Sequence, residues 1–162
     1  MLVDQTTTVV KPWYRQFYLR RGDAEWASDR VSDDGYEVRL EAIGGFVYVG
    51  TSMYGHPTEV RTELHDSEPD AVADDADHVA EVSVGGDAHL AILSWGDDDA
   101  EATIELRPGP HRLRASWFGL AAADAHPDND VGGEEPSPER LLFQLWPAPE
   151  AEQRLVRRWR RD

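Results

Sequence analysis

The feature of this sequence that most constrains its fold is a series of short runs in which apolar and polar residues alternate. The run 58–65, for example, reads TEVRTELH, so its charged residues and its Thr, Val and Leu residues fall on opposite faces of an extended chain. Gly, Pro and Asp separate the runs, and each of the pairs Gly44-Gly45 and Gly85-Gly86 suits a tight turn with a strand returning from it. The predicted strands are 13–19, 36–42, 46–51, 58–65, 78–84, 88–95, 100–106, 111–118 and 140–146.

Eight or nine closely spaced strands predict an all-β fold, built as an antiparallel β-sandwich or a jelly-roll-like domain. With 162 residues, such a domain buries enough surface to fold without disulfides or metals. We therefore expect one domain over 1–162, in which 121–138 is a long acidic loop rich in Gly and Pro.

The C-terminal segment 149–161 is the one part of the sequence that predicts a helix. Leu155, Val156 and Trp159 would form a narrow apolar stripe, and two Glu residues precede the Arg residues in the order that favours the helix dipole. We expect a C-terminal α-helix that docks this stripe on the sandwich; a flexible basic tail is the alternative.

Composition excludes several kinds of site and suggests a location. The chain has no Cys, which excludes disulfides, thiolate zinc sites, iron–sulfur clusters and a cysteine nucleophile. The first residues lack the basic and apolar regions of a signal peptide, and no apolar run approaches the length of a membrane span. A cytoplasmic location is the expectation.

The charge of the chain is strongly negative. The sequence contains 32 Asp and Glu residues against 16 Lys and Arg, for a formal net charge of −16. Such a surface repels nucleic acids and anionic lipids and attracts basic proteins, so direct binding to DNA, RNA or membranes is disfavoured. A GC-rich genome or a high-salt cytoplasm would also produce this composition, and then the charge would serve solubility alone.

The carboxylates cluster in three predicted loops, 66–77, 97–101 and 124–135. They are either solvated turns or a surface that recognises a cationic partner. The residues that we predict to bind a partner come from the first two loops, and they are Asp66, Glu68, Asp70, Asp74, Asp75, Asp77, Asp97, Asp98 and Asp99.

No motif indicates catalysis or a cofactor, so we predict no catalytic residues, no metal and no cofactor. The sequence lacks a nucleophile elbow, a Walker loop and a dinucleotide fingerprint. The run 128–132 spaces its oxygen ligands like a calcium loop, but Gly132 stands where a ligand is required. His65 and His78 would form a His/carboxylate site only if their strands paired, which is the weaker, enzymatic alternative.

Aromatic residues occupy both faces of the first predicted strand, 13–19. One face would belong to the core, which leaves the other exposed for sugars or proteins, or covered by the C-terminal helix. A carbohydrate- or small-molecule-binding module, with calcium as a structural ion, is therefore the alternative function.

Parts of the sequence resemble known families. The stretch 63–119, together with 144–149, resembles a family of uncharacterised actinobacterial proteins through strand and turn patterns such as PGPHRLRAS at 108–116. The segment Tyr14-Arg-Gln-Phe17, and the turn that leads into His111-Arg-Leu113, resemble the competence-protein J family of nuclease inhibitors more distantly. The second resemblance implies a small β domain that binds and blocks a nuclease, and it transfers no functional residues.

Together the charge and this resemblance predict a non-catalytic, inhibitor or immunity-type protein. Its partner would be a basic protein such as a nuclease or toxin, because nucleases present basic clefts that carboxylates can occupy.

Overall fold

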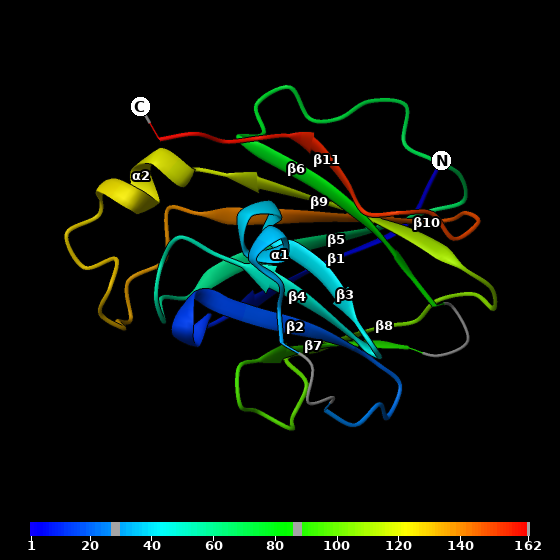
Figure 1. Ribbon diagram of the computed structural model, residues 1–162, viewed down its shortest axis with the longest axis horizontal. Helices are drawn as coiled ribbons and strands as arrows, with labels where there is room; N and C mark the ends of the chain where they lie inside the picture. Colours follow the sequence, from blue (N-terminus) through cyan, green and yellow to red (C-terminus); the bar gives the residue numbers. More distant parts are fainter. Residues whose placement is uncertain (27–29, 86–88, 162) are drawn as a thin grey trace.

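The computed structural model describes residues 1–26, 30–85 and 89–161, which form two β-sheets drawn one above the other in Figure 1. The six-stranded sheet has, in spatial order, β1 (Leu2–Val10), β5 (Thr58–His65), β10 (Arg140–Pro147), β9 (His111–Phe118), β6 (His78–Val84) and β11 (Arg154–Arg157). The five-stranded sheet has β3 (Leu40–Ile43), β4 (Phe46–Gly50), β2 (Gln16–Arg21), β7 (Leu90–Ser94) and β8 (Ala102–Ile104).

The two sheets pack face to face around one main apolar core. The rings of Phe17, from β2, and Phe143, from β10, lie 6.1 Å apart, and both side chains are fully buried. The indole Nε1–H of Trp117 in β9 donates a 2.8 Å hydrogen bond to the backbone oxygen of Gly50 in the other sheet. The predicted all-β sandwich is therefore confirmed.

Most predicted strands are present with nearly the predicted bounds, but their pairing differs in places. The Gly44-Gly45 hairpin joins β3 to β4 as expected. The turn expected after β6 does not form a hairpin, because β6 and β7 belong to different sheets; its Gly86 lies outside the described residues. The strand pairs described are antiparallel except for β5 and β10, which run parallel.

The strand predicted at 36–42 begins instead as a helix, α1 (Asp33–Val38), and only β3 is extended. The Ser32 hydroxyl accepts a hydrogen bond from the Gly35 N–H, and two Asp residues in the first turn favour the helix dipole. Arg39 adopts a left-handed conformation that ends the helix. The helix cap at Ser32 therefore determines the local structure, although the alternating pattern of this run favours a strand.

The C-terminal helix predicted over 149–161 is wrong, because this segment contains the edge strand β11. Arg112 holds the chain extended before the strand by donating hydrogen bonds to the backbone oxygens of Ala151 and Glu152. Leu155 then packs on the main core and Val156 on a separate cluster around Phe118. Consecutive apolar residues thus serve two faces, which a strand permits.

Three further differences concern an unpredicted strand, the start of the strand predicted at 13–19, and the acidic loop. Strand β1 was not predicted, since its Thr-rich sequence lies mostly exposed at a sheet edge. Residues 13–15 form a 3₁₀ turn before β2, and the 121–138 loop begins within the short helix α2 (Leu120–Ala125). Neither α-helix in the described ranges has the length and apolar character that a membrane span requires.

Candidate functional site

The acidic loop 66–77 is bound in large part to the protein's own cations. Asp66 accepts a hydrogen bond from the N-terminal ammonium, which lowers the pKa of this exposed carboxyl. Glu68 lies 3.0 Å from the guanidinium of Arg114, and Asp75 lies 3.6 Å from that of Arg140. Much of the negative charge in this loop is therefore paired.

The end of the same loop is fixed through the backbone. One guanidinium nitrogen of Arg157 donates to the backbone oxygens of Ala73, Asp74 and Ala76. The Asp77 carboxylate accepts a 3.0 Å hydrogen bond from the Leu120 N–H at the start of α2. Asp70 and Asp74 keep exposed side chains. This loop is thus structural as well as acidic.

The β7–β8 loop is different, because Asp97, Asp98 and Asp99 are exposed and form no ion pair with any described residue. Trp95, directly before this loop, is 42% exposed, and its ring lies 4.6 Å from that of Tyr14, which is 60% exposed. We call Tyr14, Trp95 and Asp97–Asp99 the acidic aromatic patch.

The backbone presents Tyr14 to this patch in an unusual conformation. Tyr14 and Arg15 have φ values of 57° and 58°, in the left-handed region that residues other than glycine rarely adopt. The ring of Tyr14 also meets the ring of Tyr54 edge-on at 5.7 Å. The strained turn places an aromatic side chain at the surface instead of within the core.

The two groups of predicted partner-binding carboxylates do not share one face. Figure 1 shows the 66–77 loop at the top of the molecule, beside the six-stranded sheet, and the β7–β8 loop at the bottom, beside the other sheet. The strands that carry His65 and His78 do not pair, because β10 and β9 separate β5 from β6, so the condition for a His/carboxylate site is not met. Among the described residues, no group of three or more His, Asp or Glu side chains is placed to hold a metal ion.

His56 organises the loop that contains 128–132, the run with oxygen ligands spaced like those of a calcium loop. Its ring nitrogens lie 2.9 Å from the backbone oxygen of Glu135 and 2.8 Å from that of Val131. The same ring lies 3.2 Å from the backbone oxygen of Asp128. The carbonyls of this loop thus surround an imidazole.

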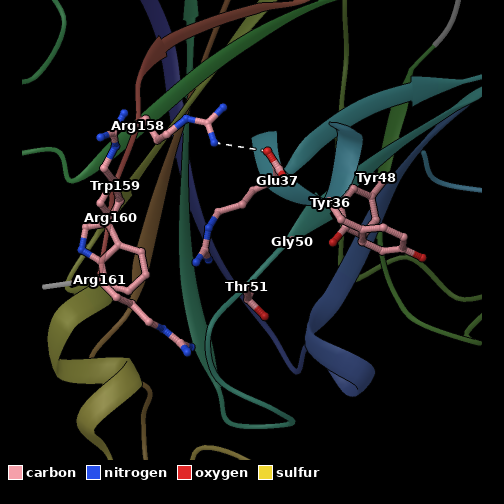
Figure 2. A pocket seen from close by; sticks show the side chains of 10 residues that line it. Tyr36, Glu37, Tyr48, Gly50, Thr51, Arg158, Trp159, Arg160 and Arg161 are labelled. Carbon is pink, nitrogen blue, oxygen red and sulfur yellow. Dashed lines mark hydrogen bonds and ion pairs between the residues drawn. The ribbon is translucent and has the colours of Figure 1, made fainter. Parts of the chain in front are cut away.

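A basic hollow of about 610 Å³ lies between the C-terminal segment and the region around α1 and β4 (Figure 2). We call it the arginine pocket. Figure 2 shows Arg158, Trp159, Arg160 and Arg161 on one side and Tyr36 and Tyr48 on the other. Its four cations, drawn from two distant parts of the sequence, are Arg39, Arg158, Arg160 and Arg161.

The cations of the arginine pocket differ in their partners. Arg158 lies 3.3 Å from Glu37, and Arg161 is bonded to Asp124. Arg39 lies under the Trp159 ring, 5.5 Å from its centroid. Arg160 is exposed and has no hydrogen-bond or ion-pair partner among the described residues.

A buried carboxyl lies behind Arg39. Glu139 is fully buried, its Oε2 accepts hydrogen bonds from the N–H groups of Ser52 and Met53, and its Oε1 lies 4.0 Å from the Arg39 guanidinium. Burial raises the pKa of Glu139 to about 7, against the smaller opposing effect of Arg39. Burial also lowers the pKa of Arg39 itself.

His78 attaches the C-terminal segment to the sandwich. Its Nε2 lies 2.7 Å from the Val38 backbone oxygen, and its Nδ1 accepts a hydrogen bond from the Trp159 N–H. These partners fix the neutral tautomer with the proton on Nε2. Burial lowers the pKa of His78 to about 4, so the imidazole stays neutral under ordinary conditions.

The arginine pocket was not predicted from sequence. The five Arg residues of the C-terminal segment were visible, but a helical interpretation of 149–161 gave no reason to bring them near Arg39. The extended conformation of the segment is what carries Trp159 and its neighbours across to α1.

Two solved structures share this fold. The crystal structure of ComJ from Bacillus subtilis, an inhibitor of the DNA degrading activity of NucA, aligns with a TM-score of 0.63 and 12% identity over 91% of this chain and 98% of ComJ. The protein of crocagin biosynthetic gene J aligns with a TM-score of 0.58 and 14% identity over 91% of this chain and 100% of its own. No protein-family model and no curated protein sequence matches the chain.

These similarities define the chain as a two-sheet β protein with the fold of ComJ. The resemblance to the competence-protein J family that the sequence suggested is therefore confirmed at the level of the fold. The resemblance to an uncharacterised actinobacterial family stays a prediction.

Proposed function

We propose that this chain is a non-catalytic acidic protein that binds and blocks a basic protein partner, such as a nuclease or toxin. The observation that carries the proposal is the shared fold with ComJ, an inhibitor of a nuclease, in a chain whose formal net charge is −16. Charge of this sign speeds association with a basic cleft and disfavours direct binding to nucleic acid.

The acidic aromatic patch is the surface that best fits this role. Exposed Tyr and Trp rings supply contact area at a small entropic cost, and they are common among the residues that dominate binding energy at interfaces. Asp97, Asp98 and Asp99 stand beside them without internal partners among the described residues. In the 66–77 loop, by contrast, a partner would have to compete with Arg114 and Arg140.

The proposal is tested by measuring binding of the immobilised chain to a panel of purified basic nucleases that includes NucA, with lysozyme as a basic protein that is no nuclease. Binding and loss of DNA degradation are expected at about 50 mM salt, with an affinity at least about tenfold weaker at about 500 mM salt. An affinity that does not change with salt, or no binding to any nuclease of the panel, would contradict the proposal.

Matched variants locate the surface. Replacing Asp97, Asp98 and Asp99 by Asn should weaken binding by about a hundredfold, because three charges beside the aromatic anchors are lost. Replacing Asp70, Asp74 and Asp75 by Asn changes the net charge equally and should weaken it by no more than about threefold. If the second triple variant has the larger effect, the patch is assigned to the wrong loop.

A further inference from the structure

We propose that the arginine pocket binds a small phosphate-bearing molecule of the nucleotide class, with its phosphate on the arginines and its planar ring against Tyr36. This site is separate from the acidic aromatic patch, and the inference does not depend on the proposed inhibitor role. It rests on the charge, the walls and the size of the pocket.

The charge of the pocket is opposite to that of the protein. Four arginines line it against a single lining carboxylate, Glu37, in a chain with a formal net charge of −16. Arginine presents planar donors that match phosphate oxygens, often two at a time. These donors make the hollow attractive to an anion, although the rest of the surface, which is negative, repels anions.

The arginines of the pocket also differ in how free they are to bind an anion. Among the residues that the structure describes, Arg160 has no partner and Arg158 pairs only with the exposed Glu37. Arg39 is largely buried, where an anion would meet little competition from water. An anion can therefore recruit two rim cations without breaking a buried ion pair.

The walls provide a place for a planar ring. Tyr36 and Tyr48 meet edge-on at 5.4 Å; Tyr48 is buried, whereas Tyr36 remains 53% exposed and presents its ring to the hollow. Figure 2 shows these rings across the hollow from Arg160 and Arg161. A volume of about 610 Å³ lies within the range of small-molecule sites.

The test is isothermal titration calorimetry with three probes: inorganic phosphate, adenosine and adenosine monophosphate. Adenosine monophosphate should bind at least about tenfold more tightly than either of the others, because only it engages both the arginines and the ring of Tyr36. Equal affinity for phosphate and the nucleotide, or no heat with either, would overturn the proposal.

Two kinds of variant separate the contributions. The double variant Arg158→Gln with Arg160→Gln should weaken nucleotide binding by at least about tenfold, whereas Arg154→Gln, which changes an exposed arginine on the same segment, should leave it within about twofold. Tyr36→Leu should weaken nucleotide binding and leave phosphate binding unchanged. Thermal melting of each variant establishes that it is folded, and equal effects of the double variant and Arg154→Gln would refute the site.

Discussion

The 66–77 loop and the β7–β8 loop are both rich in Asp, yet they relate to the rest of the protein in opposite ways. The first is tied down by Arg114, Arg140 and Arg157. The second projects Asp97–Asp99 beside exposed aromatic rings, with no ion pair among the described residues. Net charge alone therefore does not locate the carboxylates that remain available to a partner; the position of the arginines does.

The largest effect is expected from removing an arginine that serves the first loop. Arg114→Met should lower the free energy of unfolding by about 3 kcal/mol, because it leaves the buried Glu81 with only the more distant Arg112. Urea denaturation measures this change. Arg140→Met, which removes an exposed pair with Asp75, is the control and should cost about 0.5 kcal/mol. If both variants lowered the free energy of unfolding equally, burial would not be what makes the Arg114 pair stronger than the Arg140 pair.

The buried Glu139 adds a third kind of carboxylate, neither paired at the surface nor exposed. Its pKa is about 7 in the folded protein and 4.5 ordinarily, so the unfolded chain loses its proton first and stability falls as pH rises from 4.5 to 7. For His78 the pKa is about 4 against 6.5, so stability rises between pH 4 and 6.5. Each effect amounts to about 3 kcal/mol, and the two oppose each other.

Single substitutions should separate the two opposing pH dependences of stability. Glu139→Gln should give a stability that increases from pH 4.5 to 6.5, since only the His78 contribution remains. His78→Gln should give the reverse slope, whatever its overall cost. Thermal denaturation across this pH range measures both, and parallel profiles for the two variants would refute the assignment.

The smallest effect compares one carboxylate from each loop. Asp77→Ala should lower the free energy of unfolding by about 1 kcal/mol, because the Leu120 N–H loses its acceptor. Asp98→Ala should change it by less than about 0.5 kcal/mol. The same two proteins should show the opposite ranking in partner binding. A destabilised Asp98→Ala variant would mean that the β7–β8 loop is structural too.

Alternation predicted most of the sandwich because β5, β6, β9 and β10 bury one face or both with regular side-chain spacing. The alternation failed as a predictor where a local signal or a tertiary partner determines the conformation of the segment. The Ser32 cap starts a helix inside an alternating run, and Arg112 extends a segment whose apolar spacing suits a helix equally well. Pairing across sheets depends on contacts that no local pattern contains.

The candidate sites were predictable to different degrees. The carboxylates could be found by counting, but the role of each depended on which arginine folds back upon it. Glu139 carries no local signal of burial, since it stands between Pro138 and the exposed Arg140. The arginine pocket joins Arg39 to residues more than a hundred positions later, so only the fold brings it together.

The parallel pair of β5 and β10 has a consequence for synthesis of the protein. Strand β10 fills the gap between β5 and β9, both of which are translated before it. Until Pro147 has left the ribosome, both neighbours expose unsatisfied backbone edges, and the larger sheet exists only as separate pieces. Closure of the six-stranded sheet therefore waits for β10, and a chaperone that shields these edges would act before this strand is added.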